Sequence, residues 1–195
     1  MKKKVLILGG GISKERLISL ETAKSVFNEL KKKNYNVIIC EPDFDLLKNI
    51  KNFKPNVIFN ALHGQYGEDG YIQSILESQK IKYTHSGVLA SSLAMDKEIS
   101  KKIYLKNNIL TPKYIKFKFD INNKIDKKIS QLVDKKLKFP VVIKPINEGS
   151  SVNVFICDKK NIIKTLKLLK NYKQIIIEEF IAGREIQVAI LGNKK

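Results

Sequence analysis

The sequence predicts an α/β protein with an open parallel sheet in its first half and a smaller α+β lobe in its second. The first half alternates short apolar runs with segments whose apolar residues recur at helical spacing, which is typical of βαβ units. From about residue 98 the pattern changes to alternating-face strands and lysine-rich helices. At 195 residues, 43% of them hydrophobic, the chain can bury one large core or two modest ones.

The first βαβ unit carries a glycine loop at the start of its helix. An apolar strand at 5–8 runs into three glycines at 9–11, helical spacing follows over 17–30, and a second strand is expected at 37–40. Backbone N–H groups and the helix dipole attract anions at such a position. The spacing is neither GxGxxG nor the P-loop pattern, so neither motif is predicted. By position alone, Glu15 is interpreted as a helix-capping carboxylate.

A polar loop at residues 60–70 follows the third expected strand, Val57 to Phe59. It holds three glycines together with His63, Glu68 and Asp69. The carboxyl ends of strands in an open α/β sheet are the usual place for ligands, so a ligand site is expected here, with a solvated turn as the alternative.

The remaining elements are expected in a simple order. Before the boundary near residue 97 they are a helix at 70–78, a strand at 81–84 and a partly helical, small-residue segment at 86–97. After it they are a helix at 98–107, a strand at 114–119, a polar link through Asn122 and Asn123, a lysine-rich helix to Lys138, a helix around 162–169 and a strand at 175–178.

Residues 139–154, FPVVIKPINEGSSVNV, form the stretch that we call the clamp stretch. An apolar strand delivers Lys144 beside a turn at Gly149, Ser150 and Ser151, and a second strand follows at 152–157. A lysine supplies a point charge, and the turn supplies backbone N–H groups and hydroxyls that can close over phosphate oxygens. The stretch therefore suggests a triphosphate clamp, with a plain β-hairpin as the alternative.

The net charge of +18 does not by itself predict a nucleic-acid partner. The basic residues are scattered along the chain and are nearly all lysine, with Arg16 and Arg184 as the two arginines. Surfaces that read bases or bind phosphate in a forked geometry usually depend on arginine and interleaved aromatic residues. No nucleic-acid function is therefore expected.

The cysteines and the N-terminus favour a reducing compartment. Cys40 and Cys157 each end an apolar run and lack a neighbouring metal-ligand partner in sequence, so they are expected to be buried small hydrophobic residues. The first apolar run is too short for a signal peptide or a membrane span. The protein is expected to be cytoplasmic, with no membrane partner.

Five segments together resemble one enzyme family. GGISKERLISL, HGQYGEDGYIQ, SGVLASSLAMDK, PVVIKPINEGSSV and EEFIAGREIQVAI, in this order, are similar to the D-alanine–D-alanine ligases, which are ATP-grasp carboxylate–amine ligases. The resemblance implies a Rossmann-like, pre-ATP-grasp substrate domain at 1–97, a central ATP-grasp lobe at 98–181 and the start of a C-terminal lobe at 182–195, most of that lobe being absent.

The resemblance also implies a reaction in peptidoglycan precursor synthesis. ATP phosphorylates the carboxylate of one D-alanine, and the amine of a second attacks the acyl phosphate to give D-alanyl-D-alanine. Such a site must gather mutually repelling anions and exclude water from a hydrolysable intermediate. A related D-alanine–D-lactate-type ligase and a non-catalytic nucleotide-binding remnant are the alternatives.

Matched positions carry implied roles in the site. Glu15 and His63 match residues at the first D-alanine, and Ser150 matches a serine that positions Glu15 and the substrate. Glu68 is interpreted as a carboxylate that braces its loop. For ATP, the implied ligands are Lys97 and Lys144 at the phosphates, Ser150 and Ser151 in the closing loop, Glu178 at the adenine amino group, backbone groups of Glu179 and Ile181, and Glu185 at the ribose.

Three departures from the family pattern alter these expectations. His85 stands where a glycine is usual and could crowd a tight turn, and Asn153 replaces another glycine but tolerates left-handed backbone angles. The ligands of the implied Mg²⁺ would lie beyond Lys195. This chain alone is therefore expected not to make the dipeptide. The apolar face at 186–190 is expected to be uncovered.

The resemblance also implies a homodimer formed through the N-terminal domain.

Overall fold

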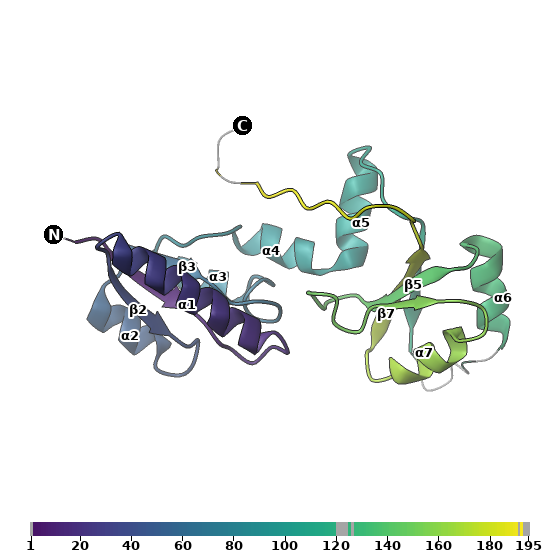
Figure 1. The fold of residues 1–195 in the computed structure, drawn as a ribbon, viewed down its shortest axis with the longest axis horizontal. Helices are drawn as coiled ribbons and strands as arrows, with labels where there is room; N and C mark the ends of the chain where they lie inside the picture. Colours follow the sequence, from purple (N-terminus) through teal and green to yellow (C-terminus); the bar gives the residue numbers. More distant parts are fainter. Residues whose placement is uncertain (1, 120–124, 126, 191, 193–195) are drawn as a thin grey trace.

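The computed structural model describes residues 2–119, 125, 127–190 and 192. It contains two separate sheets with helices α4 and α5 between them (Figure 1). The predicted link through Asn122 and Asn123 lies outside the described residues, as does the end of the C-terminal run at Leu191.

The first sheet is parallel and covered on both faces. Its strands are β1 (Lys4–Leu8), β2 (Asn36–Cys40) and β3 (Val57–Asn60), in the order β2-β1-β3. Val5 and Ile7 of β1 pack with α1 (Arg16–Lys32), whereas Leu6 and Leu8 pack with α2 (Leu46–Phe53) and α3 (Tyr71–Ser78). Successive side chains of a strand point to opposite faces of the sheet. Because helices cover both faces here, successive residues of such a strand are apolar, and its sequence is close to one continuous apolar run.

The structure corrects two expectations in this half. Helix α2 was not predicted, although Leu46, Ile50 and Phe53 have helical spacing. The strand predicted at 81–84 is reduced to a single parallel bridge between Ile58 and Tyr83. Lys80 (φ 55°) and His85 (φ 78°), at the two ends of this segment, have left-handed backbone angles. The extended part between them is therefore too short to pair with β3 as a regular strand.

The second sheet is antiparallel and has helices on one face. Its strands are β4 (Tyr114–Lys118), β5 (Val141–Pro145), β6 (Phe155–Cys157) and β7 (Gln174–Glu179), in the order β4-β7-β5-β6. Val141, Ile143, Ile175 and Ile177 share a core with α6 (Lys127–Lys136) and α7 (Ile162–Leu168). The alternate residues of β5 and β7 therefore face away from the helices, and these include Lys144 and Glu178.

The connection between the sheets is helical. Helix α4 (Val88–Met95) is followed by α5 (Lys97–Lys106), and the side chain of Asp96 caps α5 by accepting a hydrogen bond from the Ile99 N–H at 2.9 Å. After β7 the chain continues as an extended segment, yellow in Figure 1. There Ile186, Val188 and Ile190 are 76%, 78% and 91% exposed, which agrees with the uncovered apolar face that was expected.

Both cysteines are buried and free, as predicted. Burial raises the pKa of each thiol. Among the helices that the structure describes, none has the length and apolar character to cross a membrane.

Candidate functional site

The clamp stretch places two charged residues of opposite sign on one face of the second sheet. Lys144 on β5 and Glu178 on the neighbouring β7 both point away from the helices, and Lys144 Nζ forms an ion pair with Glu178 Oε1. Glu178 is only 5% exposed. A buried carboxylate is costly without a compensating charge, so the lysine is held at this face.

Lys97 brings a second cation to the same place from the start of α5. Its N–H and its Nζ each lie 3.2 Å from the Ile146 carbonyl oxygen, and Nζ also binds the Glu148 carbonyl oxygen. Burial lowers the pKa of Lys97, and the nearby positive charge of Lys144 lowers it further. Two neighbouring cations form a site that favours phosphate oxygens.

The turn of the clamp stretch is tight and left-handed. Ser150, Ser151 and Asn153 have φ values of 41°, 60° and 55°, and the Val152 N–H donates to the Gly149 carbonyl at 2.9 Å. These angles explain why β6 begins at Phe155 and not at Val152 as predicted. Both serines are exposed, and Asn153 adopts the left-handed conformation that was expected of it.

Glu15 is buried and lies between two glycines from distant parts of the chain. It occupies the N-cap of α1, but its side chain makes no capping hydrogen bond, so the capping interpretation was wrong. A Cβ atom on Gly64 would lie 2.4 Å from Glu15 Oε2, and one on Gly149 would lie 3.1 Å from the same oxygen. Glu15 is 4% exposed. Its carboxylate thus contacts both the polar loop, at Gly64, and the turn of the clamp stretch, at Gly149.

His63 is placed by contacts from two sides. Ser13 Oγ donates to its carbonyl oxygen at 2.7 Å, and its ring Nε2 lies 3.2 Å from Thr22 Oγ1. The Gly64 N–H donates to Glu68 Oε2 at 2.9 Å, so Glu68 braces the loop as interpreted from the sequence. His63 and the Glu15 carboxylate therefore flank the same turn.

A bridge not predicted from the sequence joins the two halves beside Glu15. Lys14 Nζ donates to Tyr172 Oη at 2.7 Å and to Glu148 Oε1 at 2.9 Å, and Asn153 donates to the same tyrosine at 2.6 Å. The hydrogen bonds to Tyr172 and Glu148 raise the pKa of Lys14. The sequence feature that could have indicated this bridge is the position of Lys14 next to Glu15, after the glycine loop.

The implied adenosine ligands are only partly brought together. Glu178 is in the site, but Glu179 Oε1 accepts from the Lys113 N–H at 2.9 Å and so supports the end of the sheet. Ile181, 63% exposed, and Glu185 lie on the extended segment after β7. Lys97, Lys144 and Glu178 are thus brought together, whereas Ile181 and Glu185 lie along the extended segment after β7.

A divalent metal does not fit the groups of the candidate site that the structure describes. Within the described ranges, no cluster of three or more His, Cys, Asp or Glu side chains could hold a metal ion. The buried carboxylate nearest the two lysines, Glu178, already contacts lysine ammonium groups with both oxygens. Carboxylates that bind Mg²⁺ need an oxygen free for the ion.

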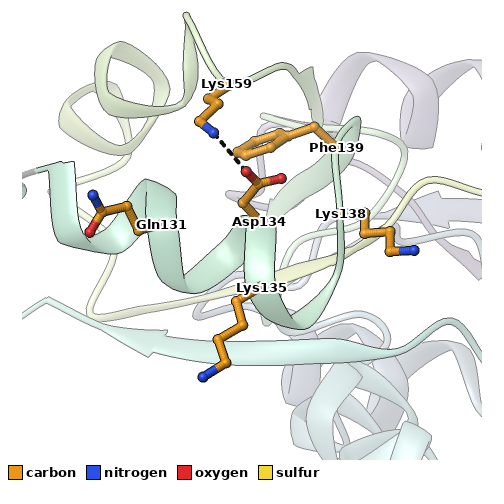
Figure 2. Close-up of a pocket in the computed structure, with 6 residues that line it drawn as sticks. All are labelled: Gln131, Asp134, Lys135, Lys138, Phe139 and Lys159. Atoms are coloured by element: carbon orange, nitrogen blue, oxygen red, sulfur yellow. Dashed lines mark hydrogen bonds and ion pairs between the residues drawn. The ribbon is translucent and has the colours of Figure 1, made fainter.

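An open depression on the second half of the chain lies away from Lys97, Lys144 and Glu178. It lies on α6, on the helix-covered side of the sheet, and Figure 2 shows Lys159 paired with Asp134 at its edge (2.7 Å). Its lining is otherwise Gln131, Lys135, Lys138 and Phe139. Lys144 and Glu178 face the opposite side, so this depression is separate from the candidate site.

His85, which stands where the ligase pattern has a glycine, lies in the turn before α4. Its φ of 78° is left-handed, but its ring is exposed and lies edge-on to Phe59 with centroids 6.0 Å apart. We expect His85→Val to lower the free energy of unfolding by about 1–2 kcal/mol, because β-branched residues tolerate such angles poorly. His85→Gly should stay within about 0.5 kcal/mol of the natural chain, since relief of strain is offset by chain entropy. Urea unfolding measures both, and equal stability of the two variants would contradict the expectation.

The chain is similar to known ligases in sequence and in fold. A family model for the C-terminal part of D-Ala–D-Ala ligases matches residues 103–195. The D-alanine–D-alanine ligase of Pelagibacter ubique is 70% identical over 194 residues, covering 100% of this chain and 63% of that protein. The enzyme of Carboxydothermus hydrogenoformans is 44% identical, covering 97% and 61%.

Solved structures give the same result. The crystal structure of the Bacillus anthracis D-alanine–D-alanine ligase matches with a TM-score of 0.78 and 34% identity, covering 93% of this chain and 58% of that one. The same enzyme complexed with ATP matches with a TM-score of 0.76 and 32% identity, covering 93% and 60%. The chain thus spans about three fifths of the length of these relatives. By sequence and by fold, it is similar to the D-alanine–D-alanine ligases over this part of their length.

Proposed function

We propose that this chain provides the first D-alanine site and the ATP phosphate clamp of a ligase that joins two D-alanines through an acyl phosphate. The proposal rests on one observation: the clamp stretch contacts both the Glu15 carboxylate and Lys97. Gly149 lies against the Glu15 carboxylate, while the carbonyls of Ile146 and Glu148, just before Gly149 in the chain, bind Lys97. A substrate carboxylate and a γ-phosphate bound beside this stretch would be held near each other.

The roles of the residues follow from their charges. Glu15 would hold the ammonium group of the first D-alanine, with His63 beside it. Lys97 and Lys144 would exchange their present oxygen partners for phosphate oxygens and neutralise charge during transfer. The exposed hydroxyls of Ser150 and Ser151, with the N–H groups of their turn, would close over the nucleotide. Mg²⁺ would supply charge neutralisation in such a reaction, and the residues that the structure describes do not supply its ligands.

The nucleoside would lie along β7 and the segment after it. Glu178 would accept from the adenine amino group, the backbone of Glu179 and Ile181 would contact the base, and Glu185 would bind the ribose. We further propose the domain division 1–97, 98–181 and 182–195, which follows the separation of the two sheets at α5. Soluble substrates and a peptidoglycan precursor as product favour the cytoplasm as the location.

Binding of substrates to the purified chain tests this function. ATP is expected to raise its melting temperature, and D-alanine is expected to add a further increase that L-alanine does not give. Glu15→Gln should remove the D-alanine increment and keep the ATP effect, because it removes only the charge that faces the ammonium group. A cooperative melt that ATP leaves unchanged would overturn the proposal and favour the non-catalytic remnant.

A homodimer is proposed on the basis of exposed apolar side chains just before and at the start of α1. Ile12, Leu17 and Ile18 are 73%, 76% and 46% exposed, although Leu17 was predicted to be part of the apolar helix face. Association would bury this surface. Sedimentation equilibrium should give twice the 22.3 kDa of the chain, and Leu17→Lys should give the monomer mass. A natural chain that remains monomeric at 100 μM would count against the dimer.

A further inference from the structure

Lys101 is a buried lysine to which the proposed function assigns no role. It lies on α5, one turn after Lys97, and is 5% exposed. Lysine is almost never fully buried unless its charge is paired. In a helix that also carries Lys97, Lys102 and Lys106, its sequence gives no sign of this difference.

The ammonium group of Lys101 is fixed by several partners. It donates to Thr111 Oγ1 at 2.8 Å and to the Pro112 carbonyl at 2.9 Å, and it lies 5.3 Å from the centre of the Tyr114 ring. It also lies 2.8 Å from Glu178 Oε2. Helix α5 and the start of β4 therefore hold this charge against one oxygen of the carboxylate.

Lys144 approaches the other oxygen of Glu178 from a more open side. Its side chain is 22% exposed, against 7% for that of Lys101. The Lys101 ammonium is anchored by Thr111 and Pro112 independently of Glu178. Of the two cations, Lys144 is therefore the one placed to move.

We propose that Lys101 is a positioning residue that keeps Glu178 paired and oriented while Lys144 exchanges between Glu178 and a nucleotide phosphate. Without Lys101, the departure of Lys144 would leave a bare buried carboxylate, which is strongly unfavourable. With Lys101 in place, the carboxylate keeps one cation and Oε1 becomes a free acceptor. The nucleotide half of this inference rests on the proposed function.

The freed Oε1 also has a consequence for base selection. A carboxylate oxygen accepts from an exocyclic amino group such as that of adenine, and it repels the carbonyl oxygen that guanine carries at the corresponding position. Because Lys101 fixes the direction of this oxygen, its loss should weaken the preference for ATP over GTP as well as the affinity for ATP.

The test is a double-mutant cycle with nucleotide affinity as the readout. We expect Lys101→Met to weaken ATP binding by about tenfold or more and Lys101→Arg to restore most of it, since arginine keeps the charge. In a Glu178→Gln background, Lys101→Met should have less than about a threefold effect, because no carboxylate charge remains to be held. An undiminished effect in that background, or an unchanged ATP affinity in Lys101→Met, would overturn the inference.

A second cycle, on stability, does not depend on nucleotide binding. In urea unfolding, Lys144→Met and Lys101→Met should each be tolerated because the other lysine remains, and the double variant should lose clearly more stability than the sum of the single losses. Additive losses would overturn the inference. If the natural chain binds no ATP and this cycle is nevertheless non-additive, the proposed function fails while the shared charge at Glu178 stands.

Discussion

Lys144→Ala is expected to weaken ATP binding to this chain by roughly 10- to 100-fold. Lys144 is the more exposed of the two lysines on Glu178, and it lies close to Lys97 on the face that would receive the phosphates. A charge-assisted hydrogen bond contributes about 1.5–3 kcal/mol, and each 1.4 kcal/mol corresponds to a tenfold change in affinity. Titration calorimetry with ATP at fixed ionic strength measures the loss.

Lys135→Ala is the matched control for this experiment. It removes the same charge from the depression on α6, on the helix-covered side of the sheet (Figure 2). Since exposed charges beyond about 10 Å are screened at 0.1 M salt, this variant should bind ATP within about twofold of the natural chain. Equal losses in the two variants would mean that net charge, and not the clamp, attracts the nucleotide.

Gly64→Ala is expected to abolish the response to D-alanine and to destabilise the fold by about 1–2 kcal/mol. Gly64 has a φ of +68°, where a side chain is strained, and its Cβ would lie 2.4 Å from Glu15 Oε2. The carboxylate must then leave its place between the two loops. Thermal melts with and without D-alanine, in the presence of ATP, measure the loss.

Gly87→Ala provides the comparison for Gly64. Its φ is −72°, and the nearest atom to a Cβ there would be 3.5 Å away, which is an ordinary contact. This variant should keep both the stability and the response to D-alanine. A Gly64→Ala chain that still responds to D-alanine would show that the position of Glu15 does not determine binding of the first substrate.

The sequence was sufficient for most elements, because their apolar patterns are strong. The runs at β1, β5 and β7 and the spacing in α1 predicted strands and a helix close to their observed bounds. Helix α2 was missed although its helical spacing was present, and two further errors fall where backbone angles decide the outcome. Positive φ values at Lys80 and His85 shorten a predicted strand to one bridge, and those at Ser150, Ser151 and Asn153 delay β6.

The candidate site was predictable in part. The resemblance pointed to Lys97, Lys144 and Glu178, which the structure brings together. Nothing in the residue pattern indicated which glycine would touch Glu15 or which lysine would be buried. Lys101 has the composition of a surface residue, and only the approach of α5 to β4 and β7 buries it. The contact of Lys101 with Glu178 joins segments far apart in the sequence, where local pattern carries no information.

The alternation of side chains along β5 has a consequence for how this protein can vary during evolution. Val141 and Ile143 face the helices, while Lys144 faces the charged side, so the number of residues in the strand determines which side chain reaches Glu178. One inserted residue would turn Lys144 into the core and an isoleucine toward the nucleotide. Substitutions between apolar residues can accumulate in this strand, whereas insertions and deletions are confined to the loops at its ends.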